Sequence, residues 1–348
     1  MTATVETTPL AAAHAPHGLL DRVLRMRELA ILLVLALMIV ATQIDNSTFL
    51  SVQGIKDLLL DGTILVLVAV GEAVVVITRN VDLSVGSVLG VTAFAAGDFL
   101  RGGGNPMLAV LLAIAVGLVF GLLNGLLVSI GQVPSLVVTL GTLYIVRGLD
   151  SVWVGSREIT ANQLSPGFAS FGHDGISAIP YLAILGALVL VALAYYLRNY
   201  RSGRECYALG SNPQAAALAG VPVRRRVLVA FMLSGALAGL AGALYLARFG
   251  YADASTGTGY ELTVVSAVVV GGVGFTGGTG SVYGAALGAL LLTTINSVLP
   301  SIGVSSVWVE AIDGILLLLA ISVDRVVALR IAGLLHKRAR AARSAGHV

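Results

Sequence analysis

Ionisable side chains inside long apolar segments are the residues of this chain whose types and positions could do chemistry. Such carboxylates can relay protons, hold ions or contact a solute, because a charge in a membrane is costly unless it lines water or has a partner. The preferred interpretation of Asp82, which opens Asp82-Leu83-Ser84, is a cap on the positive end of a helix. For Glu72 it is burial with a polar partner. The candidates are Asp61, Glu72, Asp82, Asp98, Glu261, Glu310 and Asp313.

Small neutral side chains in the same segments define a second kind of candidate site, a path for a neutral, hydroxylated solute. Hydroxyl and amide groups can hydrogen-bond such a solute, but they can equally hydrogen-bond one helix to another. Both interpretations stay open for each residue. The predicted solute path, acids included, comprises Asp82, Ser84, Ser87, Asn124, Thr139, Glu261 and Asn296.

Motifs for nucleotide or metal chemistry are missing from the sequence. The stretch Gly272-Val273-Gly274-Phe275-Thr276-Gly277 formally matches GxGxxG, but no strand-helix-strand unit with a downstream acid surrounds it. We interpret it as backbone that leaves helical geometry between two spans. No Walker lysine motif, HExxH or GxSxG occurs. We therefore predict no metal site and no cofactor bound by this chain, so any ATP use must belong to another polypeptide.

Membrane-spanning helices are the elements that must position these residues. Of the 348 residues, 57% are hydrophobic and 11% are charged, and the mean hydropathy is +0.94. An ordinary soluble domain carries about a quarter charged residues. The predicted fold class is an all-α polytopic membrane protein with about ten transmembrane helices, some short or broken. The net charge of +3 does not indicate nucleic acid, because the basic residues lie in loops and tails beside apolar segments.

The basic residues also predict the orientation. Sixteen of the 21 lysines and arginines fall on one side if both termini are cytoplasmic, as the positive-inside rule requires. The predicted parts are a cytoplasmic tail over 1–28, a transmembrane domain over 29–324 and a basic cytoplasmic tail over 325–348. Residues 51–61 are predicted as a helix on the outer surface that leads into the second span. Residues 260–275 are predicted as a broken helix, because they are shorter than the roughly 20 residues that a crossing needs.

A polar segment over residues 198–226 interrupts the apolar second half of the chain. It carries six arginines and a single acid, Glu205, so it is placed in the cytoplasm. Asn212-Pro213 predicts a helix start, and Gly220 and Pro222 predict its end, so a short helix is expected over residues 214–218. A short, well-ended helix on this face is suited to docking a soluble partner.

A faint internal repeat is visible around residues 78–90 and 271–288. Each copy has a short span, a break with polar and glycine residues, and then a glycine-rich span. Repeats whose broken helices meet near the membrane centre are a common plan in transporters.

Three motifs in chain order carry a resemblance to a known family. They are Thr78-Arg79-Asn80-Val81-Asp82-Leu83-Ser84-Val85-Gly86-Ser87, then Gly203-Arg204-x-x-Tyr207-Ala208-x-Gly210-x-Asn212-x-x-Ala215-Ala216-x-x-x-Gly220-Val221, and Gly259-x-Glu261 with Val270-Gly271-Gly272 and Gly277-Gly278-x-Gly280. From about residue 29 to 324 the chain resembles the permease subunit of bacterial ribose-type sugar importers of the ABC class. Arg79-Asn80 replaces the two glycines of the commonest pattern, and Phe49-Leu50-Ser51-Val52-Gln53 precedes the second span. Both features resemble the branch that imports autoinducer-2 or rhamnose.

The resemblance implies a multi-pass protein of the bacterial plasma (inner) membrane that imports a sugar-like solute of autoinducer-2, rhamnose or ribose type. The implied partners are cytoplasmic ATP-binding subunits that use ATP and Mg, a second permease subunit, identical or a paralogue, and an extracytoplasmic solute-binding protein. It also implies that the polar segment, as a coupling loop over 198–226, meets the ATPase. The implied coupling residues are Gly203, Tyr207, Gly210, Asn212, Ala215, Ala216 and Gly220.

Three alternative functions remain open at this point. An ion-driven secondary transporter would use Glu72 or Asp82 as its proton or sodium site, and the purified chain alone would transport. An intramembrane enzyme is disfavoured because the spans contain no nucleophile-base pair. A branched-chain amino acid permease of the ABC class would share the architecture and carry a different solute.

Overall fold

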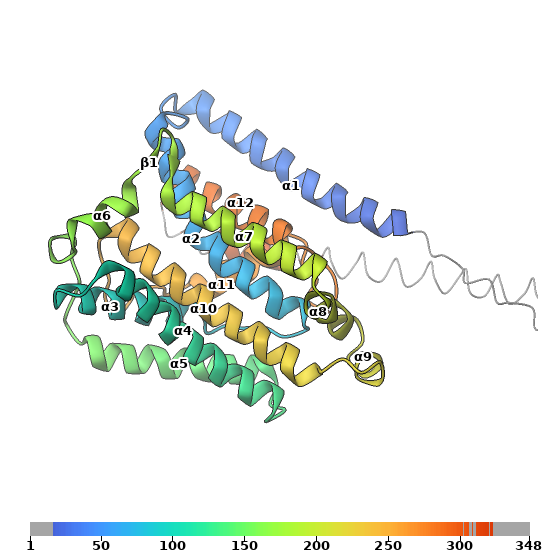
Figure 1. Cartoon of the computed structure of the whole chain (residues 1–348). Helices are drawn as coiled ribbons and strands as arrows, with labels where there is room; N and C mark the ends of the chain where they lie inside the picture. The colour runs from blue at the N-terminus through green and yellow to red at the C-terminus, as the bar shows by residue number, and fades with distance from the viewer. Residues whose placement is uncertain (1–16, 302, 306–307, 309–310, 320, 323–348) are drawn as a thin grey trace, which may run out of the picture.

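The fold is a bundle of long helices that run roughly parallel to one axis (Figure 1). The computed structural model describes residues 17–301, 303–305, 308, 311–319 and 321–322. Among these residues, seven helices are long and apolar enough to cross a membrane. They are α1 (His17–Asp45), α2 (Val52–Ile77), α4 (Pro106–Ser129), α5 (Ser135–Val154), α7 (Tyr181–Asn199), α10 (Val223–Phe249) and α12 (Val282–Ser301). The prediction of a helical, polytopic membrane protein is therefore confirmed.

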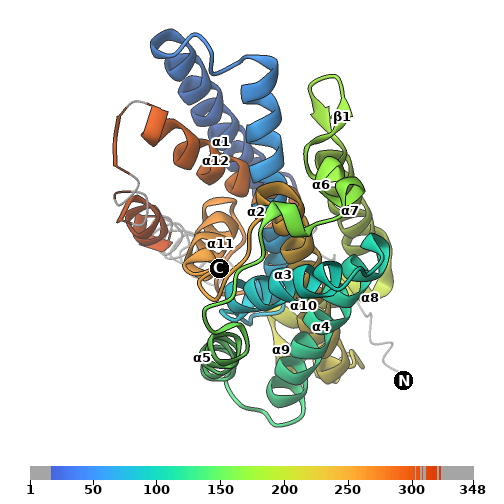
Figure 2. The ribbon, with the colours of Figure 1, turned by 90° about the vertical axis from the view of Figure 1, so that its left-hand side faces the viewer.

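Helices α2 and α10 form the centre of the bundle. In its most apolar window α2 is 94% buried, whereas α1 is only 11% buried and lies at the rim. The view along the bundle shows α2 enclosed by other helices, with α1 and α5 at the periphery (Figure 2). A fully buried helix can be apolar on all sides, and the run from Ile64 to Val70 in α2 is apolar throughout.

Glycines allow α4 to lie directly against α10. A Cβ atom added to Gly117 would approach Gly239 Cα to 2.9 Å, and one added to Gly235 would approach Gly121 Cα to 2.8 Å. Real side chains do not tolerate such distances, so these positions require glycine for backbone-to-backbone packing. This contact follows the small-residue packing expected of transmembrane helices.

Two shorter helices are joined to long ones by irregular segments. Helix α3 (Val85–Arg101) follows the break over residues 78–84, and α11 (Tyr260–Val270) precedes the break over residues 271–281. The two breaks touch, because a Cβ atom added to Gly277 would come within 3.0 Å of Arg79 Cα. Beside this contact, the backbone N–H of Gly278 donates to the carbonyl of Ile77, the last residue of α2, at 2.9 Å. The expectation that residues 260–275 contain a broken helix is confirmed, and the two segments of the proposed repeat meet at this contact.

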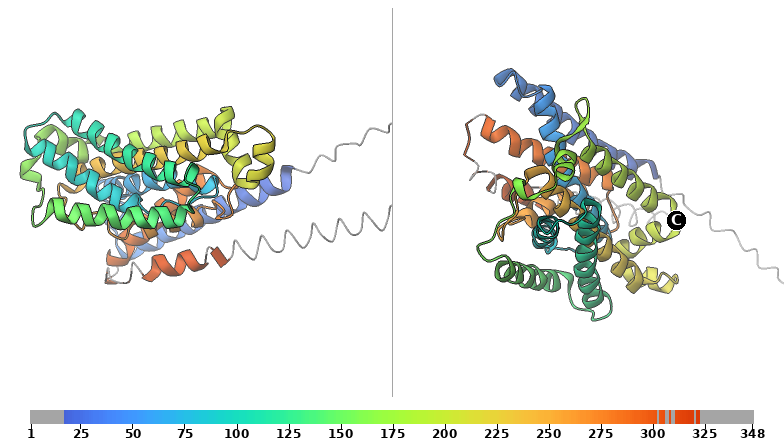
Figure 3. Two further views of the ribbon diagram at one scale, coloured as in Figure 1. Left: turned by 90° about the horizontal axis from the view of Figure 1, so that it is seen from below. Right: turned by 60° about the vertical axis from the view of Figure 1, so that its left-hand side comes forward.

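The two ends of the bundle carry different short elements. One end has the 3-10 helix η1 (Ala161–Gln163), α6 (Pro166–His173) and the hairpin of β1 (Gly175–Ile176) and β2 (Ile179–Pro180). The opposite end has α8 (Arg201–Ser211) and α9 (Pro213–Leu218). The first residues of α1 lie at the α8–α9 end (Figures 1 and 3).

Residues 52–61 form the first part of α2, which continues without a break into the span, and the N-cap Ser51 accepts a hydrogen bond from Gly54 N at 3.1 Å. The helix is exposed at Val52 and Gln53 and buried at Leu60, so it leads from the surface into the span. No proline interrupts the helix, so the surface segment and the span fuse. Helix α8 was not expected within the polar segment. The tails over 1–16 and 325–348 lie outside the described residues, as do Glu310 and parts of the expected last span over 307–323.

Candidate functional site

A buried polar network surrounds Asp82, at the break between α2 and α3. Its Oδ1 accepts hydrogen bonds from Ser84 N at 3.0 Å and from Ser84 Oγ at 2.6 Å. Asn124 Nδ2 donates a longer hydrogen bond to the same oxygen, at 3.5 Å. Its Oδ2 accepts a hydrogen bond from Ser234 Oγ at 3.2 Å. Asp82, Ser84, Asn124 and Ser234 are each at most 1% exposed. The network therefore ties the break to α4 and α10. The expectation that Asp82 caps α3 is wrong: the N-cap is Ser84, and Asp82 accepts hydrogen bonds from Ser84 itself and from the neighbouring helices.

The network continues through α2 and α5. Glu72 Oε1 accepts the backbone N–H of Asp82 at 3.0 Å, so Glu72 is buried with a polar partner. Asn124 Nδ2 donates to Ser84 Oγ at 2.9 Å, and Asn124 Oδ1 accepts a hydrogen bond from Thr142 at 2.6 Å. Thr139 Oγ1 lies 2.9 Å from Ser135 O and 3.3 Å from Val81 O. Apart from the Thr139–Ser135 bond within α5, these bonds join separate elements. They therefore fit the interpretation that these polar residues bond one helix to another.

Of the remaining predicted path residues, Ser87 adjoins the network, whereas Glu261 and Asn296 lie on other helices. Ser87 is 1% exposed, and its hydroxyl donates to Ser84 O at 2.9 Å within the start of α3. Glu261 lies in the first turn of α11, and its carboxylate packs against Gly86. Asn296 lies on α12, away from the Asp82 network. The structure thus brings Asp82, Ser84, Asn124 and Thr139 together, and it separates them from Asn296.

Asn296 lines a cavity of about 220 Å³ between α2, α11 and α12, beside the end of α10. This cavity lies towards the end of the bundle with α6, because Phe249 ends α10 and Tyr260 begins α11 there. Sequence reasoning missed most of its wall. The polar spacing of Thr293, Asn296 and Ser297 along one face of α12 is the local signal that could have revealed it. The lining residues are Asp61, Leu65, Phe249, Tyr260, Thr263, Thr293, Asn296 and Ser297.

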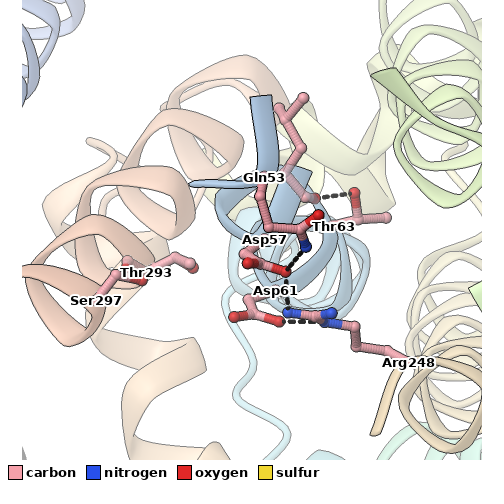
Figure 4. A network of polar contacts seen from close by, with 8 residues as sticks. Gln53, Asp57, Asp61, Thr63, Arg248, Thr293 and Ser297 are labelled. Carbon is pink, nitrogen blue, oxygen red and sulfur yellow. Dashed lines mark hydrogen bonds and ion pairs between the residues drawn. The ribbon is translucent and has the colours of Figure 1, made fainter. Parts of the chain in front are cut away.

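An ion-pair cluster borders the cavity (Figure 4). Arg248 Nε lies 2.9 Å from Asp61 Oδ1, and Arg248 Nη2 lies 2.8 Å from Asp57 Oδ1. Gln53 Nε2 donates to the same Asp57 oxygen at 3.1 Å. The Arg248 side chain is only 13% exposed, and the cluster joins the end of α10 to the first half of α2. Arg248 therefore compensates the charge of Asp61 at the cavity wall.

The opposite end of the molecule presents α9. Asn212 caps it by accepting a hydrogen bond from Ala215 N at 3.0 Å, and Gly220 follows with a φ of +79°. The predicted short helix and its two end signals are confirmed. Leu218, the last residue of α9, is 91% exposed, and sequence reasoning did not select it. Leu218 therefore places a large apolar side chain on the surface of α9.

Helix α8 holds α9 against the bundle. The Glu205 carboxylate accepts hydrogen bonds from Arg226 Nε at 2.6 Å and Arg201 Nε at 2.8 Å. The hydrogen bond from Arg226 outweighs the effect of burial and lowers the pKa of Glu205. A Cβ atom on Gly210 would come within 3.0 Å of Gly278 Cα and would also strike the Ile77 carbonyl. Gly210 therefore packs α8 onto the end of α2 and onto the break at Gly278.

The seven predicted coupling residues face two ways. Gly203, Gly210 and Ala216 are buried and Tyr207 is half-buried, so these four pack α8 and α9 against the bundle. Asn212, Ala215 and Gly220 are exposed. Within the described residues, no group of three or more His, Cys, Asp or Glu side chains could hold a metal ion.

Long apolar helices, a polar cavity at one end and an exposed short helix at the other define a multi-pass membrane transport protein. A family model described as the branched-chain amino acid transport system / permease component matches residues 54–321. The chain belongs to this permease family and is a transport subunit, not an enzyme.

Curated relatives match most of the length of this chain. The chain is 37% identical over 304 residues, 86% of each chain, to the autoinducer 2 import system permease protein LsrC of Escherichia coli (strain K12 / DH10B). It has the same identity over 302 residues to LsrC of Enterobacter sp. (strain 638), covering 86% of this chain and 87% of the relative. LsrC of Salmonella choleraesuis (strain SC-B67) matches at 37% over 295 residues, 84% of each chain. No solved structure matches the chain significantly.

Proposed function

We propose that this chain is the permease subunit of an ATP-driven importer that carries autoinducer-2 or a similar sugar-like solute across the bacterial plasma membrane. The names of the curated relatives support the solute class, and the length of the shared region supports a common architecture. The chain forms the translocation path together with a second permease subunit. An external solute-binding protein delivers the solute, and separate cytoplasmic subunits bind and hydrolyse ATP with Mg.

The observation that carries this proposal is the α8–α9 segment. Leu218 projects from α9, while Glu205 and Gly210 fix α8 to α10, α2 and the break at residue 278. A partner that moves α9 therefore moves the central helices as well. ATP binding can shift such an equilibrium only if the ATPase contacts one conformation better than the other. The α8–α9 segment provides the surface for that differential contact.

The orientation follows from the charge distribution. The α8–α9 end carries the arginines of the polar segment and the start of α1, and basic loops favour the cytoplasm. In this orientation the cavity opens towards the outside, where a solute-binding protein releases its cargo. The buried Cys206 thiol lies on the cytoplasmic side. So do the ion pairs of Glu205 with Arg201 and Arg226, which we call the α8 clamp.

The test is solute-stimulated ATP hydrolysis by the complete importer in liposomes. Leu218→Ala is compared with Leu188→Ala, because Leu188 is an exposed leucine, at 63%, in the middle of the α7 span. Truncation of an interface anchor typically costs more than 1 kcal/mol, so we expect Leu218→Ala to lower coupled hydrolysis about 5- to 30-fold. Leu188→Ala should have little effect. Equal activities of the two variants would contradict the docking role of α9.

Branched-chain amino acid import is the second candidate, because the matching family model is described by that cargo. The same liposomes separate the two functions if autoinducer-2 and L-leucine are offered side by side with their own binding proteins. Uptake of L-leucine without uptake of autoinducer-2 would favour the second candidate.

A further inference from the structure

The wall of the cavity beside the Arg248 cluster contains a buried acceptor that the described part of the protein leaves unused. Asn296 Oδ1 is buried and has no partner there. Thr293, which is only 6% exposed, lies one turn before it, and Figure 4 shows the Thr293 side chain on the side of α12 that faces Asp61. Buried polar groups in proteins are nearly always bonded, so the open Asn296 oxygen at the cavity wall indicates a missing partner.

The groups around the cavity are complementary in type. Asn296 offers both a carbonyl acceptor and amide donors, and Thr293 and Tyr260 offer hydroxyls. Asp61 uses Oδ1 to bind Arg248, which leaves Oδ2 as an acceptor. The rings of Tyr260 and Phe249 line the same space and supply apolar faces. A few placed polar groups and aromatic rings in one concave space are typical of small-molecule sites.

Charge restricts which small molecules fit. Arg248, the cation at the cavity edge, is already paired with Asp57 and Asp61. The lining residues include no lysine, arginine or histidine, and the first turn of α11 carries Glu261. A phosphate or carboxylate would therefore lose its hydration without gaining a free cation. The site favours a neutral solute with several hydroxyl groups.

Size restricts the solute further. The volume of about 220 Å³ is below the range of about 300–1,000 Å³ that drug-sized ligands occupy. A volume of this size holds a solute of monosaccharide size or smaller and is too small to enclose an oligosaccharide.

We propose that the cavity between α2, α11 and α12 is a binding site for a neutral, polyhydroxylated solute of monosaccharide size or smaller. The site lies within one permease chain, and Thr293 and Asn296 hydrogen-bond the solute hydroxyls while Arg248 holds Asp61 in place. This inference rests on the proposed import function and specifies where that function first holds its cargo in the membrane.

The test measures binding to the purified full-length chain in lipid nanodiscs, with autoinducer-2 and D-ribose as neutral probes. Ribose 5-phosphate and L-leucine serve as the anionic and zwitterionic probes. We expect a neutral probe to bind at least 10-fold more tightly than either charged probe. Equal or tighter binding of a charged probe, or no binding of either neutral probe, would overturn the assignment.

Matched variants locate the site. Thr293→Val and Asn296→Ala each remove hydrogen bonds worth about 0.5–1.5 kcal/mol, so each should weaken neutral-probe binding about 3- to 10-fold. Thr294→Val is the control, because the Thr294 hydroxyl donates to Leu290 O within α12 and the residue does not line the cavity. Thr293→Val and Thr294→Val behaving alike would overturn the site. If they do, and Leu218→Ala still uncouples hydrolysis, the site is wrong and the import function stands.

Discussion

The Asp82 network and the Asn296 cavity are both polar regions inside an apolar bundle, but they differ in how their hydrogen bonds are completed. In the network, Asp82, Ser84, Asn124 and Thr139 are all bonded to the protein and at most 1% exposed. Glu72 Oε2 has no partner among the described residues, but it does not line the cavity. In the cavity, Asn296 Oδ1 has no partner in the described residues. Completed buried bonds stabilise a fold, whereas open ones around a space await a ligand. We therefore assign structure to the network and solute binding to the cavity.

Removal of the Asp82 carboxylate should produce the largest effect on stability. Asp82→Leu leaves the hydroxyls of Ser84 and Ser234 and the N–H of Ser84 without their acceptor inside the bundle. Each orphaned group costs about 1–3 kcal/mol, so the free energy of unfolding should fall by about 3 kcal/mol or more. Denaturation of the purified chain in nanodiscs measures this loss. Asn296→Ala should cost far less, and an equal loss at both positions would erase the distinction between the two regions.

Substitutions of Glu72 should separate its hydrogen bond from its charge. Glu72→Gln keeps an acceptor for the Asp82 N–H, so the free energy of unfolding should change by less than about 1 kcal/mol. Glu72→Leu removes the acceptor and should destabilise the protein by about 1–3 kcal/mol. The same denaturation assay provides both values.

The Glu72→Gln variant also tests the ion-driven alternative. If Glu72 only supports the fold, the variant should keep ATP-dependent uptake in liposomes. Loss of uptake in a chain of unchanged stability would instead indicate that a proton or cation binds at Glu72.

Acidification should give the smallest effect, a local loss of stability at the α8 clamp around Glu205. The pKa of Glu205 is lowered, mainly by the hydrogen bond from Arg226, so the clamp contributes stability above the unfolded pKa of about 4.3. That contribution is lost as the pH falls through the lower folded pKa. Amide exchange, corrected for its intrinsic pH dependence, should show α8 protected at pH 5 and less protected near pH 3. Glu205→Gln should remove this pH-dependent part, and an unchanged profile would argue against the clamp.

Local signals in the sequence predicted the spans and the short helix α9. Asn212 and Gly220 act within a few residues of their own positions, so their roles follow from residue type. Helix α8 was missed because Gly203 and Gly210 resemble helix breakers. In the structure they permit close contact with Leu197 and with the break at Gly278.

Long-range contacts explain what the sequence could not provide. Asp82 and Ser234 are 152 positions apart, and no local pattern relates them. The cavity needs Asp61, Tyr260 and Asn296 from three helices. The path residues were selected for polarity alone, and polarity does not distinguish a hydroxyl bonded to a neighbouring helix from one that faces an open space.

The proposed mechanism depends on the orientation of the bundle, because the coupling segment must face the cytoplasm while the cavity opens outwards. The native Cys206 is a poor reporter: it is 3% exposed, and burial raises the pKa of its thiol to about 11. Single cysteines at Leu218 and at the exposed Ser156 are therefore introduced into a Cys206→Ala background. A membrane-impermeant maleimide is applied to intact spheroplasts and again after permeabilisation. The account predicts that the Ser156→Cys chain reacts at once and that the Leu218→Cys chain reacts only after permeabilisation, and the reverse order would contradict it.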